Sequence, residues 1–347
     1  MGSYKSLIIR AMHGSDKARA ELARREKEYI HTGLVGIHGE DVVYRVTETV
    51  DELVGYISKA HINNSRSYSE VILLDAYGSA TIEGARTTVE RVRCSIKNPV
   101  TKDDRMVVNV IKAQNYVYNN GISPGNIRYV WEMLTEGVCE NANIKGVKWR
   151  SDMVYIGSAT EIVHRPEEPK NIGEKMDGLF RFCGETLDEV VKACIVHFYF
   201  VSVHPFCDGN GRMARLWMSW ILSGYNKDFR YLVVSREINE SLHEYYSSLS
   251  VAEFPYNGMM DITPFIEYML QMIVNAIDFA GIQKYVKLDE IDKTIVSKVN
   301  KDGITVKRLV QVLNVPEWKV RGSLKRLVDS RMLGVDKCGK SYRYYKL

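Results

Sequence analysis

Residues 204–215 read His-Pro-Phe-Cys-Asp-Gly-Asn-Gly-Arg-Met-Ala-Arg and gather, in twelve positions, side chains that could act together in one reaction. His204 supplies an imidazole, which is suited to take a proton near neutral pH. Asp208 supplies an oxygen ligand of the kind that Mg²⁺ prefers. Arg212 and Arg215 supply guanidinium groups, which pair well with phosphate. These residue types indicate phosphoryl or nucleotidyl transfer.

The elements that would position these groups are a loop and the helix that follows it. Residues 213–222 are apolar and helix-forming, so the stretch predicts a loop that leads into a helix N-terminus. Such an end carries unpaired backbone N–H groups and a partial positive charge, and both favour phosphate. Gly209 and Gly211 allow a ligand to come close to the backbone. We therefore expect the N–H groups of Gly209, Asn210 and Gly211 to form an anion site.

Composition indicates an ordinary globular protein with two or three structural units. Of the 347 residues, 45% are hydrophobic and 26% are charged. No uncharged apolar run is long enough to span a membrane, and no secretory signal is apparent, so we expect a cytoplasmic protein without membrane contact. The 6 cysteines are scattered without a C-x-x-C pair, which argues against a zinc site or a disulfide framework.

Hydrophobic periodicity predicts a mainly α-helical body. We divide the chain into an N-terminal region (1–64), a helical domain (65–280) and a separate module (286–347). Residues 187–203 are almost uniformly apolar and predict a buried helix that leads to His204. A strand is expected over 42–50, and a short hairpin over 153–156 and 162–164 with a turn at Gly157-Ser158. The other expected helices are 18–29, 65–81, 106–118, 127–135, 237–250 and 263–279.

The C-terminal module differs in charge and pattern from the body. From Lys287 to Leu347, 15 basic residues stand against 7 acidic ones, a net charge of +8. Helices over 289–299, 306–313 and 317–328, then strands over 333–335 and 341–345 joined by residues 337–340, predict a winged helix-turn-helix. We expect Trp318 to pack inside it. Its basic residues favour double-stranded DNA as a partner, although protein contacts remain an alternative: Lys319, Arg321, Lys325, Arg326, Lys337, Lys340 and Arg343.

Residues 204–215 match every constrained position of H-x-F-x-[D/E]-G-N-G-R-x-x-R, and on this ground the chain resembles the Fic domain family. Ser79-Ala80-Thr81-Ile82-Glu83-Gly84 is similar to that family's inhibitory motif, [S/T]-x-x-x-E-[G/N]. Val154-Tyr155-Ile156-Gly157 resembles the start of its β-hairpin flap. The resemblance covers about residues 71–274 and implies a helical Fic fold with that flap.

The resemblance implies transfer of AMP from ATP to a Ser, Thr or Tyr hydroxyl of a target protein, with release of pyrophosphate. His204 would take the hydroxyl proton, and Asp208 would hold Mg²⁺, although capping the following helix is an alternative or additional role for it. Arg212 and Arg215 would grip the distal phosphates. The complete motif favours AMP over phosphate or phosphocholine. UMP or GMP transfer stays open, because the motif binds the triphosphate and not the base.

Recognition of the base and of the target is less clearly encoded. Family members often place an aromatic residue near the adenine, which would be Tyr245 or Tyr246 here, and a core or surface tyrosine pair is an equal alternative. His197 is expected in the core. In the family the flap adds a strand to the target, which would place Ile162 and Val163 at the docking site.

The position of the Ser79–Gly84 motif resembles the subgroup with an N-terminal inhibitory helix, here residues 65–84. Glu83 would pair with Arg215 and so compete with the γ-phosphate, and Ser79 and Gly84 would complete the motif. A plain helix end with a glycine cap is the alternative interpretation. In some relatives the inhibitory glutamate aligns a water that removes AMP, so an enzyme with both activities is also open.

Two classes of function therefore remain. The first is a self-inhibited protein adenylyltransferase that also modifies itself, with ATP as co-substrate and Mg²⁺ as cofactor. The second is a DNA-binding transcriptional regulator whose Fic body senses a nucleotide. The complete set of catalytic residues favours the first. Dimers are common in the family, so a homodimer is compatible with the resemblance.

Overall fold

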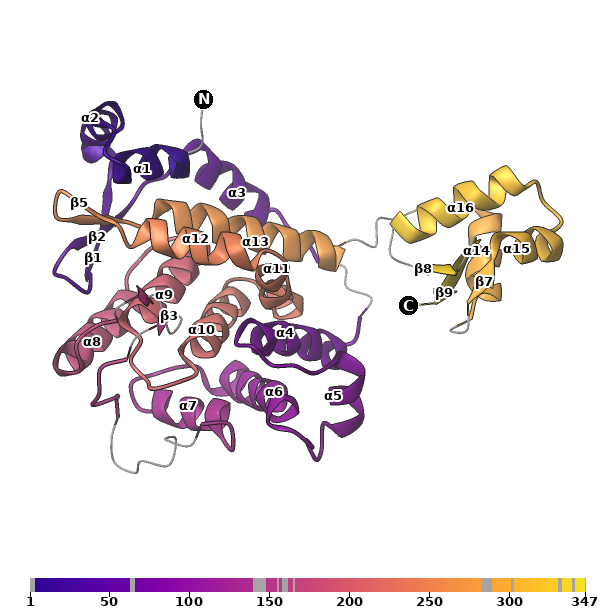
Figure 1. Ribbon diagram of the computed structural model, residues 1–347, viewed down its shortest axis with the longest axis horizontal. Helices are drawn as coiled ribbons and strands as arrows, with labels where there is room; N and C mark the ends of the chain where they lie inside the picture. The colour runs from indigo at the N-terminus through magenta and orange to yellow at the C-terminus, as the bar shows by residue number, and fades with distance from the viewer. Residues whose placement is uncertain are drawn as a thin grey trace. The chain divides into compact units, whose positions relative to one another are not determined.

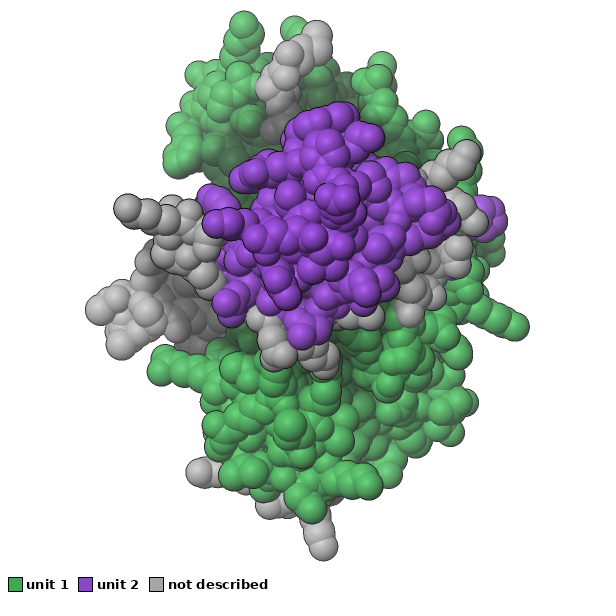
Figure 2. Space-filling view, turned by 90° about the vertical axis from the view of Figure 1, so that its right-hand side faces the viewer, with its two compact units in different colours: residues 1–60, 66–277 green, residues 61–65, 278–347 purple. Residues whose placement is uncertain are grey.

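The computed structural model divides into two compact units, each described here by itself (Figure 2). The first comprises residues 1–60 and 66–277, and the second residues 61–65 and 278–347. Among the described residues, no helix is long and apolar enough to cross a membrane. The described ranges are 4–62, 66–139, 148–154, 156–157, 162–164, 166–281, 289–300, 303–329, 333–338 and 341–346.

The first unit opens with helices and a small mixed sheet. The helices are α1 (Tyr4–Met12), α2 (Asp16–Arg25), the 3-10 turn η1 (Glu26–Glu28) and α3 (Glu48–Ser58). The strands β1 (Ile30–Val35), β2 (Asp41–Tyr44), β6 (Met259–Asp261) and β5 (Pro255–Tyr256) form a sheet in that order. β2 and β6 run parallel, whereas the β1–β2 and β5–β6 pairs are antiparallel.

Two expected boundaries in this region are wrong. The helix expected over 18–29 ends at Arg25 and continues only as a 3-10 turn. The strand expected over 42–50 ends at Tyr44, and α3 begins instead at Glu48. The cause of the second error is local, because the Thr47 side chain accepts a hydrogen bond from the Val50 N–H at 3.2 Å and caps the helix.

The Fic-like part of the unit is helical, as expected, and Figure 1 shows its helices packed around α9 and α10. α9 (Glu189–Val203) is buried over almost its whole length, which confirms the prediction of a buried helix before His204. α10 (Asn210–Tyr225) packs against it. The remaining helices are α4 (Tyr68–Ile82), α5 (Val89–Ser95), α6 (Lys102–Asn120), α7 (Ile127–Thr135), η3 (Pro169–Asn171), α8 (Ile172–Cys183), η4 (Lys227–Tyr231), α11 (Val234–Glu240), α12 (Leu242–Ala252) and α13 (Thr263–Gly281).

The single helix expected over 237–250 is instead two helices, α11 and α12, which break at Ser241. The Ser241 hydroxyl donates to the Glu237 carbonyl oxygen at 3.1 Å and lies 2.9 Å from the Tyr268 hydroxyl. A serine with such partners competes with regular helix geometry.

The expected hairpin is present as two short antiparallel strands, β3 (Ile156–Gly157) and β4 (Ile162–His164). Its first strand was placed wrongly, since Met153 and Val154 are not in a strand and Gly157, expected in the turn, belongs to β3. Ile156 pairs with His164, and Gly157 pairs with Ile162. Tyr155 and the turn residue Ser158 lie outside the described residues.

The second unit combines three helices with a three-stranded antiparallel sheet. The helices are α14 (Glu290–Lys298), α15 (Val306–Leu313) and α16 (Glu317–Asp329), which agree closely with the expected ranges. The strands are β7 (Ile304–Thr305), β8 (Leu333–Cys338) and β9 (Ser341–Lys346), in the order β7-β9-β8. Gly339 and Lys340 of the expected turn lie outside the described residues, as does the Lys337 side chain.

Two side chains of α16 differ from expectation. Trp318 is 71% exposed and does not pack inside the module, because Val320, Leu324 and Leu327 occupy the helix face toward its core. The Arg326 guanidinium contacts Asp289 at 2.8 Å and Asp292 at 2.9 Å. It therefore ties α16 to α14, and Arg326 is less available to a partner than Lys319 or Lys325.

Candidate active site

His204 stands where α9 ends. It adopts the left-handed conformation, with φ 53° and ψ 59°, and its N–H donates to the Phe200 carbonyl oxygen at 3.0 Å. A non-glycine residue in this region is uncommon and turns the chain sharply. Its Nδ1 lies 3.2 Å from the Val201 carbonyl oxygen. Since a carbonyl oxygen can only accept, Nδ1 carries the proton and Nε2 is left as the basic nitrogen.

The loop between His204 and α10 is held by buried contacts. The Asn210 side chain accepts from the Phe206 N–H at 2.9 Å and donates to the Phe206 carbonyl oxygen at 2.8 Å. Phe206 stacks on Trp131 with ring centroids 4.9 Å apart, and Trp131 Nε1 donates to the Asp208 carbonyl oxygen at 2.7 Å. Gly209 has φ +78°, which favours glycine, at the start of α10. The loop is thus shaped by the protein itself.

Asp208 and Arg212 form a pair at the start of α10. Arg212 Nη2 donates to Asp208 Oδ1 at 3.1 Å, and Nη1 donates to the Leu134 carbonyl oxygen at 2.9 Å. Asp208 Oδ1 also accepts from the Gly209 N–H at 2.5 Å. Arg212 therefore joins the loop to α7, and its contact with the distal phosphates stays a prediction.

The Asp208 carboxylate is a suitable oxygen ligand for Mg²⁺. Its side chain is 43% exposed, so a carboxylate oxygen can be reached from solvent. Mg²⁺ commonly uses one or two carboxylates together with substrate phosphates, so a single aspartate suffices. Across the part of the chain that the structure describes, no three His, Cys, Asp or Glu side chains gather as a metal site made by the protein alone.

Arg215 is the buried centre of the site. It is 1% exposed, and its Nη2 donates to Glu83 Oε1 at 2.6 Å and to the Ser79 carbonyl oxygen at 3.0 Å. Its Nε donates to Ser79 Oγ at 2.9 Å. Burial, the largest single effect, lowers the pKa of Arg215, but Glu83 together with Tyr245 and Tyr246 outweighs it, so the pKa is raised. The expected Glu83–Arg215 pair is present. Gly84, with φ +86°, follows the helix end, so the glycine-cap interpretation also holds.

The Glu83 carboxylate lies directly against the first turn of α10. A Cβ atom placed on Gly211 would lie 2.2 Å from Glu83 Oε1 and 3.1 Å from Arg215 Nη1. That Nη1 is buried and has no hydrogen-bond partner among the described residues. An unpaired buried donor beside a helix N-terminus is suited to a phosphate oxygen. A carboxylate thus occupies the edge of the expected anion site.

One cavity of about 120 Å³ brings six of the expected site residues together. Tyr246 is 45% exposed at its edge, and Leu249, Ser250 and Glu253 complete the wall contributed by α12. Neither Asp208 nor Arg212 lines it. The expected site residues that line it are His204, Gly211, Arg215, Glu83, Tyr245 and Tyr246.

Tyr245 links this cavity to the core. It is 2% exposed, and its hydroxyl lies 2.9 Å from His197 Nε2. His197 is completely buried, which confirms its expected place. Burial, with a smaller effect of Arg215, lowers the pKa of His197 to about 3, so its ring is neutral. Tyr245 is both a core residue and part of the cavity wall. The two interpretations of this tyrosine are therefore compatible.

For the two flap strands, the structure describes the backbone alone. Ile162 and Val163 belong to β4, and their side chains lie outside the described part. Their role in target docking stays a prediction.

Sequence reasoning missed Arg150, which holds the backbone of the loop that begins at His204. Its backbone N–H donates to the Pro205 carbonyl oxygen at 2.9 Å, and its Nε donates to the His204 carbonyl oxygen at 2.8 Å. The side chain is buried and also contacts the Glu167 carbonyl oxygen. No periodicity or local motif marks such a residue, because its partners at the loop, the His204 and Pro205 carbonyl oxygens, are main-chain atoms more than fifty positions away.

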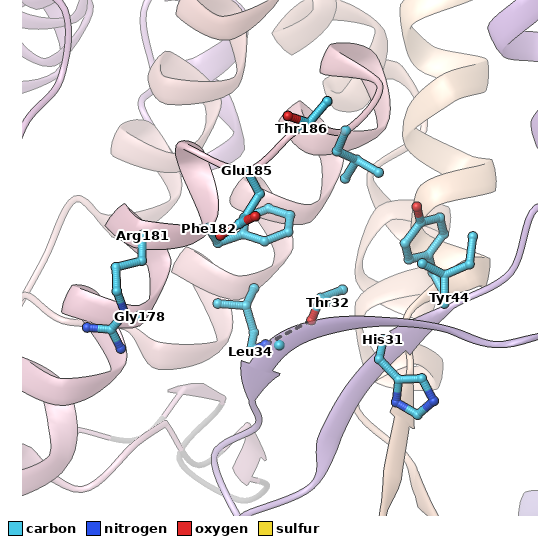
Figure 3. A pocket seen from close by; sticks show the side chains of 12 residues that line it. His31, Thr32, Leu34, Tyr44, Gly178, Arg181, Phe182, Glu185 and Thr186 are labelled. Carbon is cyan, nitrogen blue, oxygen red and sulfur yellow. Dashed lines mark hydrogen bonds between the residues drawn. The ribbon is translucent and has the colours of Figure 1, made fainter.

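A larger cavity of about 480 Å³ lies elsewhere, between β1 and the C-terminal end of α8 (Figure 3). Its labelled lining includes His31, Tyr44, Arg181, Phe182 and Glu185. It shares no lining residue with the cavity at His204. The larger of the two cavities is therefore not the one that His204 lines.

Comparison with known proteins agrees with the geometry. Residues 122–222 match the model of the Fic/DOC family. This part of the chain is thus similar to the Fic domain. Over 242 residues it is 26% identical to protein adenylyltransferase fic-1 of Caenorhabditis briggsae, which covers 65% of this chain and 44% of the relative. It is 25% identical over 252 residues to protein adenylyltransferase Fic of Nematostella vectensis, covering 69% and 55%. The chain thus spans about half the length of these relatives.

Solved structures show the same fold. A Fic family protein from Desulfovibrio desulfuricans G20 superposes with a TM-score of 0.61 at 23% identity, covering 88% of this chain and 97% of that one. A Fic domain protein from Bacteroides thetaiotaomicron gives 0.50 at 18% identity, covering 67% and 97%. The expected helical Fic fold is confirmed.

The Asn210 clamp leads to a stability prediction. Asn210→Ala leaves the Phe206 N–H and carbonyl groups buried without their partner, so the free energy of unfolding should fall by about 1–3 kcal/mol. Urea unfolding followed by circular dichroism measures this. Asn119→Ala is the control, because Asn119 is exposed near the end of α6. Equal effects of the two substitutions would contradict the clamp.

Proposed function

We propose that this protein is a protein adenylyltransferase that transfers AMP from ATP to a hydroxyl group of a target protein and of itself. The observation that carries the proposal is one cavity lined by His204, by Gly211 at the N-terminus of α10 and by Arg215. A base, an anion site and a guanidinium are the parts that such a transfer needs. The relatives named protein adenylyltransferase support the same reaction class.

In the proposed reaction His204 Nε2 takes the proton of the acceptor hydroxyl. The hydroxyl oxygen then forms a bond to the α-phosphorus, and the bond from that phosphorus to the oxygen bridging toward the β-phosphate breaks. Pyrophosphate leaves, and AMP stays on the target. The backbone N–H groups at the start of α10 hold the phosphate charge. Bound Mg²⁺, held by Asp208, would supply further charge neutralisation.

The proposed enzyme restrains itself through Glu83. The carboxylate pairs with Arg215 at 2.6 Å and lies against Gly211, where a phosphate would come. A carboxylate and a γ-phosphate compete for the same guanidinium, and their negative charges repel each other. ATP would then bind in a pose that does not present its α-phosphorus to the acceptor.

Removing the Glu83 carboxylate should remove the inhibition of AMP transfer. We expect Glu83→Gly to raise self-modification about tenfold or more, equivalent to about 1.4 kcal/mol of released inhibition. Autoradiography with labelled ATP and Mg²⁺ measures it. Glu136→Gly is a matched control, since Glu136 is also the C-cap residue of its helix, α7, but its side chain is 69% exposed. An unchanged rate in Glu83→Gly would reject the competition.

Removing the base should separate binding from chemistry. In the Glu83→Gly background, His204→Ala should abolish AMP transfer and leave ATP affinity within about a factor of three, since the imidazole serves the acceptor and not the phosphates. Isothermal titration of ATP and intact-mass spectrometry measure the two quantities. His243→Ala, an exposed histidine on α12, should keep full transfer. Labelling that persists without His204 would exclude it as the base.

A second candidate function concerns the second unit, for which we propose a winged helix that contacts double-stranded DNA. Its support is the exposed cationic residues of α16, Lys319, Arg321 and Lys325, although Arg321 pairs with Glu317 at 2.6 Å. Each lysine that contacts a phosphate should reduce the salt dependence of binding by about one unit when replaced by alanine.

Fluorescence anisotropy with a short random-sequence duplex at several KCl concentrations tests this second function. Lys325→Ala should weaken binding and lower the salt slope, and Lys293→Ala on α14 is the control, because Lys293 pairs with Glu290. Duplex binding without pyrophosphate release from Glu83→Gly would favour a regulator over an enzyme. Absence of duplex binding at low salt would reject DNA as the partner.

A further inference from the structure

The helix that carries Glu83 is fixed to the rest of the unit by its contact with α11. α4 is buried on most sides and packs along α11, α6 and α10. Ser79 and Glu83 lie one turn apart near its C-terminal end, and both contact Arg215. The place of α4 along α11 therefore decides whether these two residues reach the guanidinium.

Gly78 brings the two helix backbones into direct contact. A Cβ atom at this position would lie 2.7 Å from the Arg236 backbone nitrogen, and 2.9 Å from both the Arg236 Cα and the Ser235 carbonyl carbon. All three are main-chain atoms, so no side-chain rotation relieves the overlap. Gly78 has ordinary helical dihedrals, and glycine inside a helix costs about 1 kcal/mol relative to alanine. The glycine is thus used for close approach and not for a turn.

Asp75 makes the second attachment, one turn before Gly78. It is 4% exposed, and its Oδ1 accepts a hydrogen bond from the Ser235 N–H at 2.8 Å. Ser235 lies in the first turn of α11, where N–H groups have no partner within the helix. The residue that precedes α11, Val233, has no side-chain cap. Asp75 therefore supplies from α4 the cap that α11 lacks.

We propose that Gly78 and Asp75 are positioning residues that hold α4, and with it the Glu83 carboxylate, within hydrogen-bonding distance of Arg215. The proposal rests on the proposed function and names a control point of the same site. Any Cβ at position 78 must move from 2.7 Å to at least 3.4 Å from the α11 backbone to reach ordinary contact. A shift of that size would lengthen the hydrogen bonds of Ser79 and Glu83 to Arg215, now 2.6–3.0 Å long, to about 3.3–3.7 Å and so weaken them.

The experiment compares Gly78→Ala with Gly55→Ala, measuring AMP incorporation from labelled ATP. Gly55 lies in helix α3, and its added Cβ would meet nothing within 4 Å. Gly78→Ala should raise the rate several-fold above the unmodified chain, up to that of Glu83→Gly, while its melting temperature falls. Gly55→Ala should leave the rate unchanged. The double variant Gly78→Ala/Glu83→Gly should be no faster than Glu83→Gly, because both changes release the same inhibition.

Asp75 gives an independent variant in case Gly78→Ala does not fold. Asp75→Ala should raise the rate, whereas Asp75→Asn keeps an acceptor for the Ser235 N–H and should stay near the unmodified rate. A purely structural role would lower the rate in both. A rate in Asp75→Ala and Gly78→Ala equal to that of the unmodified chain would overturn the proposal.

A crystal structure of Gly78→Ala separates this proposal from the proposed function. The distance between Glu83 Oε1 and Arg215 Nη2 should lengthen to about 3.3 Å, and a distance unchanged from 2.6 Å would overturn the positioning role whatever the activity. If Glu83→Gly itself transfers no AMP, the proposed function fails, and this distance still decides the role of Gly78.

Discussion

The buried guanidinium of Arg215 needs a negatively charged partner. The other parts of the site are arranged around that ion pair. Leaving such a charge unpaired in the interior costs several kcal/mol, so some anion must accompany it. In this structure the anion is Glu83, at 2.6 Å. In the proposed reaction a nucleotide phosphate would replace it only if the carboxylate withdraws, because Glu83 Oε1 already lies beside Gly211. Such an exchange of one anion for another would keep the guanidinium paired throughout.

Beside this pair, the loop before α10 is held by contacts of Asn210, Trp131 and Arg212 within the protein. Arg215 Nη1 remains buried without a hydrogen-bond partner among the described residues, next to Gly211. A preorganised donor of this kind stabilises charge without reorganisation during the reaction.

Prediction from the sequence succeeded where the residues concerned are neighbours in the chain. The loop, the helix start at Asn210 and the buried helix α9 follow from neighbouring residues. The Glu83–Arg215 pair joins residues 132 positions apart and was expected only through the family resemblance. Arg212 points to α7 and Trp318 points outward, because side-chain direction depends on tertiary packing. Arg150 and Asp75 bind main-chain groups of distant segments, for which a single sequence carries no signal.

The most direct measurement is a pair of crystal structures, of the unmodified chain and of Glu83→Gly, each with Mg²⁺ and a non-hydrolysable ATP analogue. We predict that the γ-phosphate contacts Arg215 only when the carboxylate is absent, and that the α-phosphorus then faces His204. The same phosphate pose in both structures, with Glu83 still on Arg215, would contradict competition for one guanidinium.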